Sequence, residues 1–379
     1  MITKRIFPKT GEATSLLGFG CMRLPVLDGS VNEAAVAKLF DRALELGVNY
    51  FDTAYAYHDG QSESVVGRQL VQRHPRDSYF VATKMPYWLC QKPEDFDRLF
   101  NIQLERLQTT YLDYYLIHSI DESEWHRLKN LGINDFIARE QAAGRIHRIG
   151  FSSHDKPERI INIMDDRDWD FVQLQINYLD WKQQNAELAY NGAVERGLSV
   201  IVMEPVRGGG LATLATEAAA ILKQAAPDKS LASWAIRWCG SLSQVQVVLS
   251  GMNELTQLED NVAQFSPLEP ITNAEQKTID KALVAMADLP IINCTGCDYC
   301  TVCPESIAIS DIFSAYNSLI QLNDPRGLTE SYLKFTSPEH QADHCTKCET
   351  CLSYCPQHID IPGELERVHK RALELSGGG

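Results

Sequence analysis

The chain has 379 residues, 44% of them hydrophobic, so it is long enough for a large core and a second, smaller module. Its formal net charge of −15 disfavours binding of nucleic acid or anionic lipid through a broad basic surface. The N-terminal region lacks a secretory signal pattern, and no apolar run approaches the roughly 20 residues of a membrane helix. We therefore expect a cytoplasmic protein that binds neither nucleic acid nor membrane.

Short apolar segments alternate with amphipathic stretches over the first two thirds of the chain. We predict strands at residues 16–24, 48–54, 78–86, 112–119, 146–153, 171–178, 198–206 and 245–252. Between them, residues 32–47, 62–74 and 93–108 carry apolar side chains at helical spacing. Eight strand–helix units in about 250 residues predict an α/β fold of the (β/α)8 TIM barrel type. A doubly wound open sheet is the alternative, but the first strand lacks the G-x-G-x-x-G turn expected after it.

A segment with two prolines, residues 265–270, marks a boundary between the predicted barrel and the rest of the chain. We assign residues 1–268 to the barrel and residues 269–379 to a small, mostly helical, ferredoxin-like domain. Helical patterns in that domain cover residues 273–289, 310–322 and 362–375.

Eight of the eleven cysteines lie in two tight arrays, and each array ends in Cys-Pro. The first has the spacing C-x2-C-x2-C-x2-C and consists of Cys294, Cys297, Cys300 and Cys303. The second has the bacterial ferredoxin spacing C-x2-C-x2-C-x3-C and consists of Cys345, Cys348, Cys351 and Cys355. These arrays predict two [4Fe–4S] clusters. Zinc sites usually separate their cysteine pairs by a longer loop, and disulfides belong to exported proteins, so both alternatives fit less well.

In two-cluster ferredoxins the fourth cysteine of each array ligates the cluster of the other array. This rule assigns one cluster to Cys294, Cys297, Cys300 and Cys355. It assigns the other cluster to Cys345, Cys348, Cys351 and Cys303. The first array has two residues instead of three before its last cysteine, so Cys303 departs from the bacterial spacing.

Three consecutive predicted strands end near Asp52, Lys84 and His118, and Tyr57 follows in the loop after Asp52. In TIM barrels this end of the strands carries the active site. A phenol is a poor proton donor at neutral pH, but a nearby ammonium lowers its pKa, and a carboxylate keeps that ammonium charged. Each residue alone has an ordinary structural interpretation. Together they predict the reduction of a carbonyl group.

The segments FDTAYAY, SESVVGRQL, VATK, LIH, GFSS and VQLQINY resemble the aldo-keto reductase family in order and spacing, over about residues 14–265. The cysteine arrays resemble the subgroup of that family that carries a C-terminal ferredoxin-like domain. The resemblance implies a catalytic tetrad of Asp52, Tyr57, Lys84 and His118. It also selects Tyr57 over Tyr55 as the proton donor.

The resemblance further implies a nicotinamide cofactor, NADPH or NADH. The residues implied for it are Ser152, Ser153, Gln175, Met203, Gly208, Gly209 and Asn261. Ser152 and Gln175 would bind the carboxamide, the two glycines would lie over the pyrophosphate, and Asn261 would contact the adenine.

Several positions depart from the family pattern. Ser153 stands where many members have asparagine, and Met203 stands where many stack an aromatic ring on the nicotinamide. The positions that usually bind the 2′-phosphate of NADPH carry no cation here; they are Gly251, Met252 and Gln257. The choice between NADPH and NADH therefore stays open.

Three functions stay open on this basis. The first is an oxidoreductase that interconverts a small-molecule carbonyl and an alcohol and exchanges electrons with a redox partner protein through the clusters. Because nicotinamide transfers two electrons and each cluster one, a flavin is a candidate coupling cofactor, although no flavin motif is recognisable. The second is a self-sufficient NAD(P)H-dependent carbonyl reductase with structural or redox-sensing clusters. The third is a binding or electron-transfer module with a silent barrel, which the complete tetrad disfavours.

Overall fold

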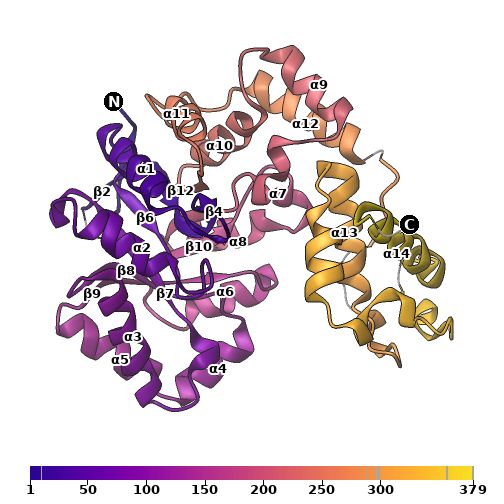
Figure 1. Cartoon of the computed structure of the whole chain (residues 1–379), viewed down its shortest axis with the longest axis horizontal. Helices are drawn as coiled ribbons and strands as arrows, with labels where there is room; N and C mark the ends of the chain where they lie inside the picture. Colours follow the sequence, from indigo (N-terminus) through magenta and orange to yellow (C-terminus); the bar gives the residue numbers. More distant parts are fainter. Residues whose placement is uncertain (10, 288, 295, 297–298, 356, 378–379) are drawn as a thin grey trace. The chain divides into compact units, whose positions relative to one another are not determined.

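The computed structural model describes residues 1–9, 11–287, 289–294, 296, 299–355 and 357–377 (Figure 1). The chain forms two compact units. The first contains Met1–Arg207 and Ala232–Thr272, and the second contains Gly208–Leu231 and Asn273–Gly379. The segment Gly208–Leu231 was not expected in the second unit. The domain boundary at residue 268 stays a prediction.

The first unit is a closed barrel, which confirms the predicted TIM fold. Within the described residues its parallel strands are β3 (Leu17–Gly20), β6 (Tyr50–Asp52), β7 (Phe80–Met85), β8 (Leu112–Ile117), β9 (Ile146–Ser153), β10 (Phe171–Gln175), β11 (Ser199–Met203) and β12 (Val245–Gly251). Each pairs with its neighbour in chain order, and β12 pairs with β3 to close the barrel. The predicted strands are all present, mostly shorter at their ends.

Helices follow the strands around the barrel. They are α1 (Glu33–Glu45), α2 (Ser62–Val66), α3 (Glu94–Leu107), α4 (Glu122–Asn130), α5 (Ile133–Ala142), α6 (Pro157–Asp165), α7 (Asp180–Gln183), α8 (Ala186–Glu195), α10 (Leu231–Ser241) and α11 (Leu255–Gln264). At the start of α1, the Asn32 side chain accepts a hydrogen bond from the Ala35 amide and so caps the helix. Its end is marked by Gly47 at φ 91°, a conformation that glycine adopts without strain.

The barrel interior is filled by apolar side chains at alternating strand positions. They are Phe7, Tyr50, Ala82, Tyr114, Leu116, Phe171, Ile201, Val247 and Leu249. Phe7 comes from the antiparallel hairpin β1 (Lys4–Ile6) and β2 (Ala13–Ser15), which the sequence did not indicate; a second small hairpin pairs β4 (Val26–Leu27) with β5 (Ser30–Val31). Because strand side chains alternate, the residues two positions after Tyr50, Ala82 and Leu116 face the same interior. Those residues are Asp52, Lys84 and His118.

The second unit is mainly helical, as predicted. Its helices are α9 (Thr216–Ala225), α12 (Asn273–Ala287), α13 (Ile309–Leu322), the π-helical η7 (Gly327–Phe335) and α14 (Ile361–Leu375). Helix α9 packs alongside α12, which explains why residues 208–231 belong to this unit (Figure 1). A core that includes Ile312, Phe313, Leu328 and Leu365 joins α13, η7 and α14. In the part of the chain that the structure describes, no helix is both long and apolar enough to cross a membrane.

Candidate active site and cluster site

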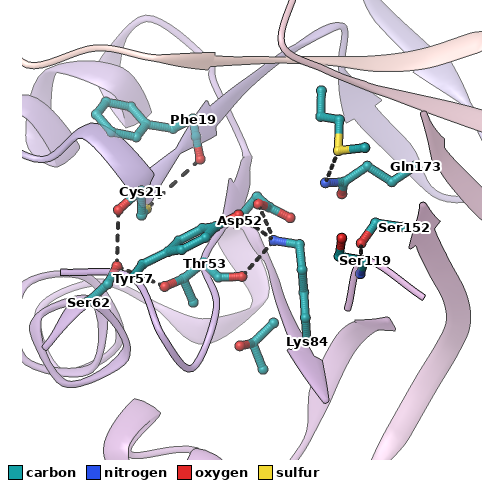
Figure 2. Close-up of polar contacts among 12 residues, drawn as sticks. Phe19, Cys21, Asp52, Thr53, Tyr57, Ser62, Lys84, Ser119, Ser152 and Gln173 are labelled. Atoms are coloured by element: carbon teal, nitrogen blue, oxygen red, sulfur yellow. Dashed lines mark hydrogen bonds and ion pairs between the residues drawn. The ribbon is translucent and has the colours of Figure 1, made fainter. Parts of the chain in front are cut away.

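The four predicted tetrad residues lie together at the C-terminal end of the barrel. The Lys84 ammonium donates to Asp52 Oδ1 at 2.5 Å and to the Thr53 carbonyl at 2.8 Å, and its Nζ lies 3.4 Å from the Tyr57 hydroxyl (Figure 2). The His118 ring stands edge-on to Tyr57, with 5.9 Å between ring centroids. An ammonium, a phenol and an imidazole therefore share one site.

The rival phenol points elsewhere. The Tyr55 ring lies against the Arg106 guanidinium, whose central carbon is 4.1 Å from the ring centroid. Arg106 also donates to the Tyr55 carbonyl at 3.4 Å. Of the two tyrosines in this loop, Tyr57 is the one that contacts Lys84.

Burial and charge set the protonation states in the site. Burial alone lowers the pKa of Lys84, but Asp52 and Tyr57 outweigh it, so the pKa of Lys84 is raised and the ammonium stays charged. Burial also raises the pKa of Tyr57, and Lys84 offsets this only in part. Lys84 thus lowers the pKa of the phenol, as expected, but desolvation is the larger effect, so the pKa of Tyr57 lies above its usual value. Burial, and to a smaller extent the positive charge of Lys84, lowers the pKa of His118 to about 3, which leaves a neutral imidazole.

A network of buried hydrogen bonds connects the backbone of Lys84 to the loop that carries Tyr57. Glu63, fully buried on α2, accepts hydrogen bonds from Thr83 and Gln103 at 2.6 Å and from Arg106 at 3.2 Å. Gln103 also donates to the Lys84 carbonyl at 2.9 Å. The network thus links the end of β7 to the loop that carries Tyr57. Sequence reasoning missed it; the available signal was a carboxylate among the buried positions of a short helix.

The residues predicted for the nicotinamide carboxamide lie on adjacent strand ends. Ser152 Oγ accepts from the Ser119 amide at 2.7 Å, and Ser153 Oγ accepts from the Asp155 amide at 3.1 Å. Gln175 and Met203 are register partners on β10 and β11.

The structure adds Gln173 to this group. Its amide nitrogen lies 3.6 Å from the Met203 sulfur, and its side-chain oxygen is buried with no hydrogen-bond partner among the described residues. Within the same part of the chain, Asp52 Oδ2 and His118 Nδ1 are also buried without a partner. Buried polar atoms without a partner also occur elsewhere in the described residues, but these three lie at the end of the barrel where a bound polar ligand would complete their hydrogen bonds.

The other predicted cofactor residues lie on different elements, Asn261 on α11 and the two glycines in the segment after β11. Asn261 is 5% exposed and donates to Ser250 Oγ at 3.0 Å, so it is tied to β12. Gly208 and Gly209 have φ angles of 62° and 102° and belong to the second unit. There, Arg326 donates to the Gly208 carbonyl at 2.8 Å.

The second unit contains a cavity lined by cysteines. Its walls include Cys303, Cys345, Cys348 and Cys351, which are the four ligands predicted for the second cluster. Apolar side chains such as Ile307, Ile309 and Leu365 line the rest. Lys347 and Glu349 adopt left-handed backbone conformations between these cysteines, which curls the loop around the cavity. The donor set fits an iron–sulfur cluster, since clusters of this type are held by four thiolates.

The first predicted ligand set is seen in part. Cys294, Cys300 and Cys355 are partly buried against the core of the second unit, whereas Cys297 lies outside the described residues. No disulfide links the cysteines in the described ranges. Among those same residues, no three ligating side chains converge closely enough for a single metal ion.

Fold and sites together define the class, which is a TIM-barrel oxidoreductase with an iron–sulfur domain. Residues 16–284 match the model of the aldo/keto reductase family, and residues 293–359 match the model of the 4Fe-4S dicluster domain. The chain belongs to the aldo/keto reductase family, and the predicted subgroup is confirmed.

Curated relatives and solved structures agree with this placement. L-galactose dehydrogenase of Arabidopsis thaliana is 25% identical over 74% of this chain and 93% of its own. A solved aldo-keto reductase from Bacillus halodurans, in its holo form, aligns with a TM-score of 0.61 and 26% identity over 74% of this chain and 96% of its own. An aldo-keto reductase from Klebsiella pneumoniae in complex with NADPH aligns with the same TM-score and shares the fold at 20% identity, over 74% of this chain and 95% of its own.

Proposed function

We propose that the barrel interconverts a carbonyl and an alcohol on a small molecule, with NADPH or NADH as the hydride carrier. The observation that carries this proposal is the position of the Lys84 ammonium, between Asp52 at 2.5 Å and the Tyr57 hydroxyl at 3.4 Å. The nicotinamide, when bound, supplies a hydride to the carbonyl carbon. The residues of the chain then have to hold the substrate oxygen and protonate it.

Each tetrad residue has one task in this proposal. The Tyr57 hydroxyl donates its proton to the substrate oxygen, and Lys84 stabilises the phenolate that forms. Asp52 keeps Lys84 charged and oriented. The neutral His118 imidazole hydrogen-bonds the substrate oxygen and so orients the carbonyl. In the oxidative direction the same groups act in reverse, with Tyr57 as the base.

We assign the cofactor to the rim residues on the basis of family membership. Ser152 and Gln175 would hold the carboxamide, with Ser153, Gln173 and Met203 beside them. Gly208, Gly209 and Asn261 would contact the pyrophosphate and the adenine. Because the Arabidopsis relative is an L-galactose dehydrogenase, a sugar hydroxyl is the first substrate class to test.

The C-terminal domain would carry two [4Fe–4S] clusters and exchange electrons with a redox partner protein in a reducing cytoplasm. The cavity lined by four thiols supports the second cluster. Because a hydride carries two electrons and each cluster accepts one, a flavin is the coupling group to look for. In the alternative, the barrel is a self-sufficient carbonyl reductase and the clusters are structural or redox-sensing.

An anaerobic titration separates these two functions. NADH and then NADPH are added to cluster-loaded protein without substrate, and the visible cluster band is followed. Bleaching supports the electron-transfer function. An unchanged band, in protein that binds the nicotinamide and whose clusters dithionite reduces, argues for the self-sufficient reductase or for electrons supplied by a substrate. Absence of nicotinamide binding contradicts both.

A further inference from the structure

A buried carboxylate outside the tetrad lies next to the predicted carboxamide site. Asp180, the first residue of α7, is 0% exposed and follows β10 by a short turn. Its Oδ2 accepts from Gln175 Nε2 at 2.8 Å and from Asn177 Nδ2 at 2.7 Å. Its Oδ1 lies 3.3 Å from the Nε of Arg207. One carboxylate thus accepts hydrogen bonds from two amides through Oδ2 and forms an ion pair with a guanidinium through Oδ1, the latter without a hydrogen bond.

The chemistry of a carboxylate decides the orientation of both amides. An ionised carboxylate only accepts hydrogen bonds, so Gln175 and Asn177 must turn their NH2 groups towards Asp180. The Asn177 oxygen then accepts from the backbone amides of Leu179 and Asp180, at 3.1 and 2.8 Å, which fixes the turn. The Gln175 oxygen is turned away from Asp180. It lies 3.0 Å from Nδ1 of the exposed His154.

Arg207 compensates the buried charge. Its side chain is 16% exposed, and burial of a carboxylate without such a partner is costly. Arg207 and Glu204 both have left-handed backbone conformations, at φ 48° and 53°. The Glu204 carbonyl accepts from Asn177 Nδ2 at 3.2 Å. Ion pair and hydrogen bond together hold this loop after β11 in a conformation that non-glycine residues adopt only when their surroundings impose it.

Ser152, on the neighbouring strand β9, supplies a hydrogen-bond donor, whereas the Gln175 oxygen is an acceptor. Its Oγ accepts from the Ser119 amide, so its hydroxyl hydrogen is free to donate elsewhere. Ser152 therefore offers a donor on β9, and the Gln175 oxygen offers an acceptor on β10. A primary carboxamide has the matching pair, because its oxygen accepts and its NH2 donates.

We propose that Asp180, neutralised by Arg207, is a positioning residue that orients the Gln175 amide so that its oxygen receives the NH2 group of the nicotinamide carboxamide. This inference rests on the proposed function, in which the barrel binds a nicotinamide. It makes Asp180 the origin of selectivity for an amide over an isosteric ketone at that position. Without Asp180, the Gln175 NH2 group keeps only its longer, 3.5 Å contact with the Gln184 side-chain oxygen, and we expect the amide to rotate by half a turn and present its NH2 group instead.

The test measures dissociation constants for cluster-loaded protein under anaerobic conditions. The probes are the reduced cofactor that binds more tightly, its 3-acetylpyridine analogue, which lacks the NH2 group, and ADP-ribose (or its 2′-phosphate for NADPH), which lacks the ring. For the unsubstituted protein we expect about tenfold weaker binding of the analogue, the value of one hydrogen bond. For Asp180→Asn we expect this preference to disappear, with affinity for the ring-free probe unchanged. Asp165→Asn is the matched control, since it breaks the exposed ion pair of Asp165 with Arg196.

A second variant keeps the test decisive if Asp180→Asn folds poorly. Asp180→Asn combined with Arg207→Gln leaves no unpaired charge, and we expect the same loss of preference. Retention of the tenfold preference by a folded variant overturns the inference. Equal weakening of all three probes also overturns it, because that is the result of a general structural role. Failure of the unsubstituted protein to bind NADH or NADPH contradicts the proposed function instead.

Discussion

Lys84 donates a hydrogen bond to Asp52 over 2.5 Å, and the two side chains are 1% and 4% exposed. An ion pair this deeply buried contributes little net stability, but removal of one partner leaves a charge without compensation. Neither residue can therefore be replaced alone without a loss of stability, and the pair also supports the chemistry proposed for Tyr57.

The first prediction concerns this dependence. We expect Lys84→Met to lower the free energy of unfolding by about 3–5 kcal/mol, because Asp52 is left buried and unpaired. Lys84→Met combined with Asp52→Leu should recover most of that loss and still lack carbonyl reduction. Anaerobic urea unfolding followed by circular dichroism measures both effects. Equal stability of the single variant and the unsubstituted protein would contradict a buried ion pair.

The second prediction separates the two tyrosines of the loop. We expect Tyr57→Phe to lower the rate of carbonyl reduction by about 10²–10⁴, the usual contribution of a general acid. Nicotinamide affinity should stay the same. In Tyr55→Phe the ring against Arg106 is retained, so the rate should stay within about a factor of three. Single-turnover reduction of a test aldehyde gives both rates. Equal losses of rate in the two variants would contradict the choice of Tyr57 over Tyr55 as the proton donor.

The third prediction concerns Glu63, which accepts hydrogen bonds from Thr83, Gln103 and Arg106. In Glu63→Gln one acceptor oxygen becomes a donor, so at least one of these bonds is lost, at a cost of about 1–3 kcal/mol. Because Gln103 also bonds the Lys84 carbonyl, we expect kcat to fall while the KM for the nicotinamide changes little. Glu259→Gln, at the exposed partner of Arg42, is the control. A fall in stability with unchanged kcat would limit Glu63 to a structural role.

The fourth prediction uses the lowered pKa of His118, about 3 in the folded protein against about 6.5 in an unfolded chain. Between these values the unfolded state binds a proton that the folded state does not, so stability decreases as pH falls through this window. The limiting slope is about 1.4 kcal/mol per pH unit. Thermal midpoints between pH 7.5 and 5.5 should therefore fall more steeply for the unsubstituted protein than for His118→Gln. Parallel slopes would contradict a neutral, buried imidazole.

The barrel, and the meeting of Asp52, Lys84 and His118 at one end of it, could be predicted because both depend on periodic patterns. Apolar strands end at Asp52, Lys84 and His118, and barrel geometry brings such ends to one rim. Two features that the sequence did not indicate, the place of helix α9 and the first hairpin, depend on tertiary contacts. Helix α9 joins the second unit through its packing on α12, and the first hairpin consists of strands of three residues each, too short for a reliable pattern.

The two buried carboxylates, Glu63 and Asp180, could not be predicted from the sequence for a related reason. Glu63 and Asp180 are charged residues in short helices, where a carboxylate is ordinarily solvent-exposed. Their burial depends on partners from other elements, which are Thr83 and Gln103 for Glu63 and Arg207 for Asp180. The lowering effect of Lys84 on the pKa of Tyr57 could be predicted from its charge, whereas the larger, opposing effect of desolvation depends on burial that the sequence does not indicate.

The last prediction tests the ligand sets of the clusters. The cavity that contains Cys345, Cys348 and Cys351 also contains Cys303, from the other array. If Cys303 belongs to that cluster, Cys303→Ser should lower the iron content from about eight to about four atoms per chain. Adding Cys345→Ser should cause no further loss, because both residues would serve the same cluster. Adding Cys294→Ser should instead remove the remaining iron.

Iron analysis and low-temperature EPR of the dithionite-reduced protein distinguish these outcomes. If instead Cys345→Ser abolished the remaining iron and Cys294→Ser did not, each array would hold its own cluster and the crossover would be wrong.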